Sequence, residues 1–229
     1  MKTLKISLLA LATGFAMAGA ARADDDKLVI AYNVGASTNY EFRGISQTDR
    51  KAQIFAGVDA TYGKFYAGTW LSNVDFHNGT SAEYDFYAGF KPQAGPVTFD
   101  LGMIYYGYAD KPSGADEAYY EYKAAASVPV GKATVGAVVF YSPEFPFKSG
   151  EATYYEINGS APINDKWSVS GALGHQSVVG PADYTTWNLG VGYALNSHIG
   201  FDLRYWDTDE HSFGRIYDSK VVLGVKATF

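Results

Sequence analysis

The sequence has 229 residues, of which 18 are basic, 24 are acidic and none is cysteine, and its net charge is −6. The lack of cysteine excludes a disulfide framework and a thiolate metal site, and the negative charge disfavours nucleic acid as a partner. The sequence also has no phosphate-binding glycine loop and no zinc-ligand spacing, so no cofactor and no metal are expected.

The first 23 residues have the pattern of a secretory signal peptide. Lys2 and Lys5 form a basic start, residues 6–20 are mostly apolar, and Ala21-Arg22-Ala23 has the form of an A-x-A cleavage site. Residues 24–229 are then expected to be exported as one domain. Loss of three basic residues from the 18 leaves 15 against 24 acidic ones, a net charge of −9. After residue 23 no apolar run is long enough for a membrane-spanning helix.

The rest of the chain alternates between apolar and polar residues with the period of a β-strand. We count twelve such segments of roughly ten residues, the length that a tilted strand needs to cross a bilayer. In the first segment the predicted outward positions are Tyr32, Val34, Ala36, Thr38, Tyr40 and Phe42. In the third segment, residues 65–76, the alternation is ambiguous, which suggests a β-bulge.

The connectors between these segments alternate in length. Residues 62–64, 91–96, 129–132, 162–166 and 195–197 are short turns, and residues 45–52, 77–81, 109–116, 142–151, 177–183 and 208–215 are longer polar loops. Short turns at one end and longer loops at the other are typical of outer-membrane barrels. The pattern predicts an all-β fold, a transmembrane antiparallel up-and-down β-barrel of about twelve strands, with ten and fourteen as alternatives. Both chain ends are expected on the periplasmic, short-turn side.

A soluble lipocalin-like barrel or a β-sandwich is the alternative fold, and it would bury the apolar faces. Two features argue against it. Glycine, asparagine or a charged residue recurs along the polar faces of the segments. The outward aromatic residues gather near the strand ends, as they do in the girdles of membrane barrels.

Residues 39–76, NYEFRGISQTDRKAQIFAGVDATYGKFYAGTWLSNVDF, resemble the TorF-type porins, a family of small outer-membrane proteins of proteobacteria. The best matches are FRGISQT at residues 42–48, FYAG at 65–68 and SNVDF at 72–76. The similarity is weaker over the rest of residues 24–229. It implies a small outer-membrane barrel with porin activity, and it implies no particular solute or oligomeric state.

The last segment looks like the signal that the barrel-assembly machinery reads. Its outward face ends in an aromatic residue and comprises Tyr217, Val221, Leu223, Val225, Ala227 and Phe229, with Ser219 among them. We therefore expect the barrel-assembly machinery and outer-membrane lipids to be partners of this protein, beside small solutes.

Charged residues on the polar faces would line the lumen. The predicted lumen cluster near the loops comprises Glu41, Arg43, Asp75, Glu83, Asp85, Glu121, Lys123, Glu156, Arg204, Asp218 and Lys220, with Asp59, Asp100, Asp202 and Lys226 nearer the turns. Most of these charges are expected to pair across strands. For Arg43 the first candidate is Asp218, and Glu83 and Asp85 are the others. Acids in excess would favour cations, as rings of carboxylates do in channels.

Six bulky residues on the polar faces would narrow or close the passage: Phe55, Tyr87, Ile104, Tyr106, Phe140 and Trp206. Twelve strands enclose more space than filled eight-stranded barrels and less than open sixteen-stranded porins. The sequence therefore predicts a narrow passive channel for small hydrophilic solutes with a mild cation preference. The alternative is a structural or adhesive barrel with a blocked lumen.

Two motifs raise the alternative of an enzyme. His175-Gln176-Ser177 has the His-x-Ser spacing of outer-membrane phospholipases and lipid A deacylases, which would make the protein a lipid-modifying esterase. No outward group on the neighbouring segments is placed to orient the histidine, as catalysis requires. DTDEH at residues 207–211 resembles an omptin-like Asp/His pair, but a facing acidic pair is not evident, and calcium would need more oxygen ligands. We therefore predict no enzyme activity and no catalytic residue.

Overall fold

A computed structural model describes residues 27–180 and 182–229, so the predicted signal peptide at residues 1–23 lies outside the described residues. Twelve long strands make up most of this part of the chain: β1 (Leu28–Ser37), β4 (Gln53–Tyr62), β5 (Phe65–Asn73), β6 (Ala82–Phe90), β8 (Val97–Ala109), β9 (Tyr119–Val130), β10 (Ala133–Ser142), β11 (Ala152–Pro162), β12 (Trp167–Val178), β13 (Tyr184–Ala194), β14 (Ile199–Thr208) and β15 (Lys220–Thr228). The connections contain the short strands β2 (Glu41–Phe42), β3 (Ile45–Ser46) and β7 (Gln93–Ala94) and the 3-10 helices η1 (Pro146–Lys148) and η2 (His211–Phe213). No helix within the described residues is long and apolar enough to span a membrane.

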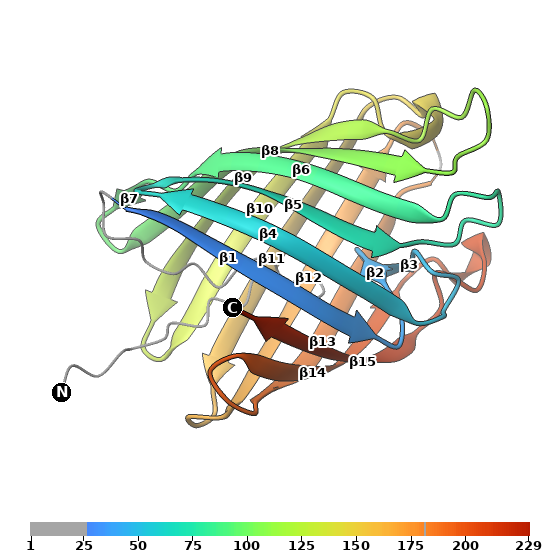
Figure 1. Ribbon diagram of the computed structural model, residues 1–229. Helices are drawn as coiled ribbons and strands as arrows, with labels where there is room; N and C mark the ends of the chain where they lie inside the picture. Colours follow the sequence, from blue (N-terminus) through green and yellow to red (C-terminus); the bar gives the residue numbers. More distant parts are fainter. Residues whose placement is uncertain (1–26, 181) are drawn as a thin grey trace.

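The twelve long strands form one closed antiparallel barrel (Figure 1). Each long strand pairs with the next one along the chain, and β15 pairs with β1, which closes the barrel. Short turns lie at the end where β1 begins and β15 ends, which we call the turn end, and longer connections lie at the opposite loop end. The predicted up-and-down barrel of about twelve strands is confirmed.

Alternate side chains along each strand divide between the outside of the barrel and the lumen. Phe86 of β6, for example, is exposed on the outside, whereas its neighbours Asp85 and Tyr87 face the lumen and are buried. Outward aromatic rings contact one another near both ends. The ring centroids of Phe65 and Phe90 are 4.8 Å apart at the turn end, and those of Tyr105 and Tyr120 are 5.0 Å apart toward the loop end. The outside is therefore apolar, with aromatic residues toward both rims.

Strand β5 has a regular register, so the bulge that the ambiguous alternation suggested is not found between residues 65 and 72. Its pairing with β4 runs without interruption over these residues. Tyr66 and Trp70 point into the lumen, while Thr69 between them points outward. The alternation was ambiguous because β5 places large aromatic residues on its inward face.

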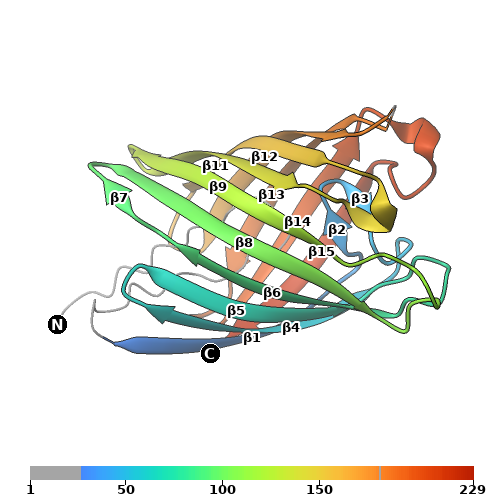
Figure 2. The ribbon, with the colours of Figure 1, turned by 90° about the horizontal axis from the view of Figure 1, so that it is seen from above.

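The chain between β1 and β4 folds into the lumen. Strand β1 ends at Ser37, and β2 and β3 form a separate hairpin inside the barrel, as Figure 2 also shows. The prediction that Tyr40 and Phe42 are outward residues of the first strand is therefore wrong. On the hairpin, Tyr40 packs against Trp70 and Phe42 packs against Tyr106. The hairpin is itself extended, so the alternation continues through it and does not reveal that the chain has left the wall.

Arg43 and Gly44 form the tip of this inward hairpin. Phe42 pairs with Ile45 across them, and the two tip residues have positive φ angles of 52° and 82°. A two-residue turn of this kind favours asparagine, aspartate or glycine at its first position, so arginine is a poor choice for the backbone. At Gly44 a Cβ atom would lie 2.2 Å from the Thr186 hydroxyl oxygen, so the tip is packed closely against β13.

The lumen is filled at the loop end and open toward the turn end. Inward residues near the hairpin are buried: Tyr119, Glu121 and Tyr154 are at most 4 % exposed. Asp59 and Asp100 are buried nearer the turn end, but many other inward residues there are small or polar and only half-buried; they include Ser127, Thr134, Gly136, Asn158, Ser160, Ala172 and Lys226. Because these side chains point into the barrel, their exposure indicates that solvent reaches the lumen from the turn end.

The outward face of β15 largely follows the predicted pattern. Val221, Leu223 and Phe229 are exposed on the outside of the barrel. Tyr217 is an exception, because it precedes β15 and its ring packs edge-on against that of Tyr184, with the centroids 5.4 Å apart. Tyr217 therefore belongs to the packing of the loop end and not to the outward face of the last strand.

Removal of Phe229 is expected to lower the yield of folded barrel, measured as the heat-modifiable fraction on gels, while export across the inner membrane continues. Its N–H donates to the Tyr32 carbonyl at 2.9 Å, and its carbonyl accepts from the Tyr32 N–H at 3.0 Å. The deletion therefore removes two bonds from the pair that closes the barrel. The substitution Phe229→Tyr keeps both bonds and an aromatic ring, and it should fold normally. An undiminished yield after deletion would contradict an assembly role.

Candidate functional site

The inward hairpin places Arg43 against the wall opposite β1. Its guanidinium donates to both carboxylate oxygens of Glu121 on β9, at 2.8 and 2.6 Å, and to the side-chain oxygen of Gln176 on β12, at 2.9 Å. The side chains of Arg43 and Glu121 are each 2 % exposed. A bidentate pair is the strongest form of the arginine–carboxylate interaction, so this contact fixes the tip of the hairpin across the lumen.

Three aromatic rings surround the same guanidinium. Its central carbon lies 4.6 Å from the ring centroid of Phe42, 4.8 Å from that of Phe140 and 4.3 Å from that of Tyr154. These distances are within the range of cation–π attraction. Phe42 belongs to the hairpin, whereas Phe140 and Tyr154 belong to β10 and β11, so the barrel wall provides most of the contacts.

The predicted partner of Arg43 is wrong in identity. An inward carboxylate does bind Arg43, but it is Glu121 and neither Asp218 nor the acids of β6. Asp218 lies at the loop end, where its half-exposed carboxylate is 3.8 Å from Arg50. The difference follows from the hairpin, which carries Arg43 away from β15 and over to the far wall.

Lys220 and Tyr40 hold the other parts of the hairpin. The ammonium nitrogen of Lys220 on β15 is 3.3 Å from the Glu41 carboxylate and donates to the Gly44 carbonyl at 3.1 Å. The Tyr40 hydroxyl donates to Glu83 on β6 at 2.5 Å. The hairpin is therefore attached to three separate parts of the wall.

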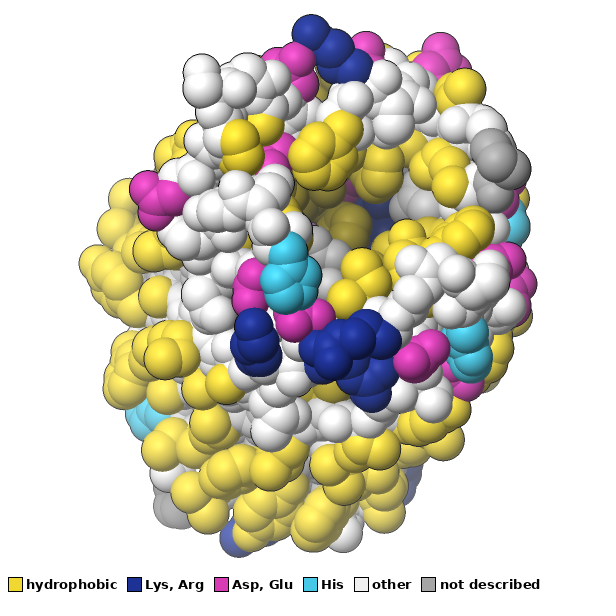
Figure 3. All heavy atoms as spheres, turned by 90° about the vertical axis from the view of Figure 1, so that its right-hand side faces the viewer, with side chains coloured by type: hydrophobic (Ala, Val, Ile, Leu, Met, Phe, Trp, Pro, Cys, Tyr) yellow, Lys and Arg dark blue, Asp and Glu magenta, His cyan; other side chains and the backbone are white. Residues whose placement is uncertain are grey.

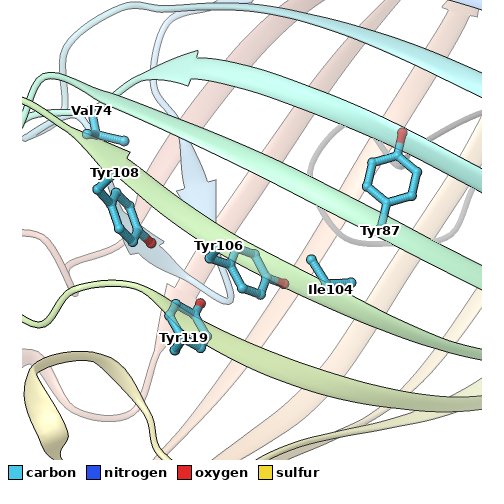
Figure 4. Packing of buried hydrophobic residues seen from close by; sticks show 6 residues of the cluster. All are labelled: Val74, Tyr87, Ile104, Tyr106, Tyr108 and Tyr119. Atoms are coloured by element: carbon cyan, nitrogen blue, oxygen red, sulfur yellow. The ribbon is translucent and has the colours of Figure 1, made fainter.

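Figure 4 shows the aromatic wall beside the hairpin. Tyr106 of β8 and Tyr119 of β9 stack with their centroids 4.5 Å apart. The buried cluster on this wall consists of Val74, Tyr87, Ile104, Tyr106, Tyr108 and Tyr119, and Phe140 packs against it. Phe55 and Trp206 are also buried in the lumen. All six bulky residues that were expected to narrow the passage therefore face the lumen.

Most of the predicted lumen cluster lies inside the barrel: Glu41, Arg43, Glu83, Asp85, Glu121, Lys123, Glu156, Arg204 and Lys220. Asp75 and Asp218 are the exceptions, because both lie in connections at the loop end. Lys123 lies deeper than predicted, since its ammonium nitrogen is 2.7 Å from Asp100. These three residues lie elsewhere than predicted because the alternation of apolar and polar residues does not define where each strand ends.

Arg204 forms a second network on the inner face, on the turn side of the hairpin. Its guanidinium donates to Asp202 at 3.0 Å, to Asn188 at 2.6 Å and to the Ser170 hydroxyl at 2.7 Å. A cavity of about 30 Å³ lies between this network and the hairpin residue Glu41. Its volume leaves space for a few water molecules at most.

Glu83, Asp85 and Glu156 are among the inward acids that form no salt bridge within the described chain. Glu83 accepts its hydrogen bond from Tyr40, and Glu156 accepts one from Tyr154. One carboxylate oxygen of Asp85 is buried without a hydrogen-bond partner. These three side chains are at most 5 % exposed. A buried carboxylate without a counter-charge is costly, so such a group either takes up a proton or attracts a cation.

Charged residues of the loops form a separate network at the mouth, and Figure 3 looks onto this end of the barrel. Arg215 donates to Asp49 at 2.8 Å, Lys51 lies 2.6 Å from Asp75, and His77 is 3.0 Å from Asp49. The bond from Arg215 holds the pKa of Asp49 below its usual value, and Lys51 does the same to the pKa of Asp75. The two acids and His77 are close enough to share a metal ion. Because basic side chains already contact both carboxylates, the cluster is explained as an ion-pair network.

Comparison with known proteins places the chain in a family. Residues 21–229 match the family model described as "Bacterial protein of unknown function (Gcw_chp)". The chain belongs to the Gcw_chp family. No curated protein matches the sequence.

Solved porin structures share the fold of this Gcw_chp protein. A KdgM porin is similar with a TM-score of 0.61 and 10 % identity, over 87 % of this chain and 98 % of that chain. The KdgM porin in complex with disordered oligogalacturonate gives a TM-score of 0.62 and 9 % identity over the same shares. The NanC porin gives 0.57 and 11 %, over 88 % of this chain and 99 % of that chain. At these identities the likeness is one of fold.

The His-x-Ser motif of the Gcw_chp protein is not assembled as a nucleophile and base. The Ser177 hydroxyl donates to Asp183 at 3.2 Å, and Nδ1 of His175 is 3.1 Å from the Thr185 hydroxyl. Nε2 of His175 lies 4.0 Å from Asp183. The serine therefore bonds to the carboxylate, whereas a nucleophilic serine needs its bond to the histidine.

Asp207 and His211 are in contact at the loop end. Nε2 of His211 lies 2.8 Å from one oxygen of Asp207, and the Tyr205 hydroxyl donates to the other at 2.7 Å. The hydrogen bond with Asp207 raises the pKa of His211. The pair ties the connection after β14 to the end of that strand.

Glu117 is a buried acid that the sequence analysis of the Gcw_chp protein missed. It is 1 % exposed and accepts hydrogen bonds from Thr80 at 2.8 Å and from Asn78 at 2.6 Å. It directly follows a segment predicted to be a loop. The sequence could have revealed it through the alternation of the next strand, because Glu117 lies two residues before Tyr119 and four before Glu121, which both point inward.

Proposed function

We propose that this Gcw_chp protein is an outer-membrane porin, a narrow passive channel for small hydrophilic solutes with a mild preference for cations. The observation that carries the proposal is a closed barrel with an apolar outside and a hydrophilic lumen that is open toward the turn end. The aromatic residues toward both rims suit the two interfaces of a membrane. The resemblance to TorF-type porins and the fold shared with the KdgM and NanC porins support the same function.

The inward hairpin makes the proposed channel narrow. It crosses the loop half of the lumen, where the cavity beside Glu41 measures about 30 Å³. The loop end is nevertheless hollowed in Figure 3. Ions and small solutes would pass beside the hairpin, and larger solutes would require it to move. Export by the signal peptide and insertion by the barrel-assembly machinery belong to this proposal.

The proposed cation preference rests on the inward acids without a basic partner. Glu83, Asp85 and Glu156 face the lumen in its buried loop half. In their charged form, carboxylates at such positions attract cations and repel anions that enter the channel. The substitutions Glu83→Gln and Glu156→Gln together should therefore weaken the preference, whereas Asp165→Asn in an exposed turn should leave it unchanged.

Planar-bilayer recording of the purified protein with a salt gradient tests the proposal. We expect stepwise conductance with a reversal potential on the cation side, and a smaller reversal potential in the Glu83→Gln/Glu156→Gln variant. A reversal potential on the anion side would contradict the cation preference. Silence of the wild-type barrel would favour a structural or adhesive protein whose lumen the hairpin blocks.

A further inference from the structure

We infer that the wall around Arg43 is a binding site for a guanidinium group, and that a small solute carrying this group competes with Arg43 for it. We call this site the wall pocket, defined by Tyr106, Glu121, Phe140, Tyr154 and Gln176. These residues come from five neighbouring strands, β8 to β12. The inference rests on the proposed channel only for the route by which the solute arrives.

The wall pocket is organised by hydrogen bonds of its own. The Tyr106 hydroxyl donates to Glu121 at 3.1 Å, and the Tyr154 hydroxyl donates to Glu156 at 2.7 Å. The amide nitrogen of Gln176 donates to a backbone carbonyl of β11 at 3.3 Å, which turns its oxygen toward Arg43. None of these bonds involves the hairpin. The wall therefore holds its acceptors in place independently of Arg43, and a preorganised site binds with less loss of entropy.

Glycine makes room for one wall of the pocket. A Cβ atom on Gly174 of β12 would lie 2.2 Å from the Tyr154 hydroxyl oxygen, so the ring lies across this glycine. In that position its face is 4.3 Å from the central carbon of the guanidinium. Because Gly174 has no side chain, the Tyr154 ring of β11 can lie over the neighbouring strand β12 and form one wall of the pocket.

The chemistry of the wall pocket selects a guanidinium. Glu121 offers two oxygens side by side, Gln176 offers a third, and Phe140 and Tyr154 offer ring faces. A planar group with several N–H donors in a fixed fork satisfies all of these at once. An ammonium ion is a point charge that cannot make the parallel pair of bonds with equal geometry. An anion would be repelled by the buried carboxylate.

The backbone conformation at Arg43 indicates that arginine occupies this position because of the contacts of its side chain and not because it suits the turn. The φ angle of 52° is unfavourable for arginine, and the two-residue turn of Arg43 and Gly44 would be more stable with asparagine as its first residue. Residues in strained backbone conformations persist where the surroundings require them, often at functional sites. Arg43 therefore acts as an internal ligand, which neutralises Glu121 when no solute is bound. A solute guanidinium can replace its bonds one for one and release the tip.

The first test uses Arg43→Asn, which removes the guanidinium and gives the turn its most favourable residue pair. The thermal unfolding of this variant in detergent micelles is measured with methylguanidinium chloride at about 20 mM, far below denaturing concentrations. We expect the unfolding temperature to rise by several degrees through binding to the folded state. Methylammonium chloride at the same concentration should have little effect, and the double variant Arg43→Asn/Glu121→Gln should not respond to either salt. An equal response to both salts, or no response, would overturn the site.

The second test measures displacement in the presence of Arg43. The wild-type chain has no cysteine, so Ile45→Cys places a single thiol at a half-buried position of the hairpin, with Ser46→Cys at the next, buried position as the substitute if the first variant folds poorly. We expect methylguanidinium to raise the rate of thiol labelling several-fold and methylammonium to leave it unchanged. A labelling rate indifferent to methylguanidinium would overturn the competition. Neither test requires ion conduction, so failure of the inference and failure of the channel proposal are distinguishable.

Discussion

Replacement of residues 38–52 with an asparagine–glycine turn is expected to raise the single-channel conductance several-fold in planar bilayers. The replaced segment contains the inward hairpin, whose tip contacts the far wall of the lumen. Ser37 of β1 and Gln53 of β4 pair directly with each other, so a two-residue turn can join them without disturbing the wall. The wider lumen at the loop end would then meet the open part at the turn end.

A matched control is available at the same end of the barrel. Ser142 of β10 and Ala152 of β11 pair directly with each other. Residues 143–151, which include η1, can therefore be replaced with the same turn. This loop lies at the rim of the barrel, where Phe147 is exposed, and its loss should change the conductance much less. If both replacements had the same small effect, the hairpin would not be the constriction.

The substitution Arg43→Ala is expected to lower the free energy of unfolding by about 3 kcal/mol, measured by urea unfolding in lipid vesicles. It leaves the Glu121 carboxylate buried without its cation and removes the guanidinium from three aromatic rings. Loss of the positive charge should also increase the cation preference of any current.

A double-mutant cycle separates the ion pair from the backbone effect. Arg43→Ala combined with Glu121→Gln should cost less than the sum of the two single changes, because each single change leaves a charge unpaired. Arg43→Asn should be more stable than Arg43→Ala, since asparagine tolerates the positive φ angle. A loss below about 0.5 kcal/mol for Arg43→Ala, the size of an ordinary surface change, would show that the pair does not hold the hairpin.

The wall of the barrel could be predicted because its pattern is local. Residues such as Trp187 and Leu223 alternate with polar neighbours within one strand, and the outward or inward direction of each follows from that period alone. Closure and strand number then follow from the count of segments and from the lengths of their connections. Trp70 was harder to place because an aromatic side chain is compatible with either face.

The hairpin could not be predicted from the same pattern. Tyr40 and Phe42 continue the alternation of β1, and only the contacts with Trp70 and Tyr106 show that they lie inside. The partner of Arg43 is 78 residues away in the sequence. Such a contact depends on how far the hairpin reaches across the lumen, which no local period encodes. Gly44 in the stretch FRGI would have been a hint, because glycine suits a tight turn with a positive φ angle.

In the proposed channel, the unequal filling of the lumen also determines where an applied voltage acts. Electrical resistance is greatest where the passage is narrowest, so most of a transmembrane potential would fall across the loop half, around Arg43. An elementary charge that crosses the whole potential gains about 2.3 kcal/mol per 100 mV. A potential that is negative at the loop end would pull the guanidinium toward that end and push the Glu121 carboxylate the other way, and the opposite polarity would reverse both forces. The proposed channel would therefore carry current unequally in the two directions, with the hairpin as its voltage-sensitive part.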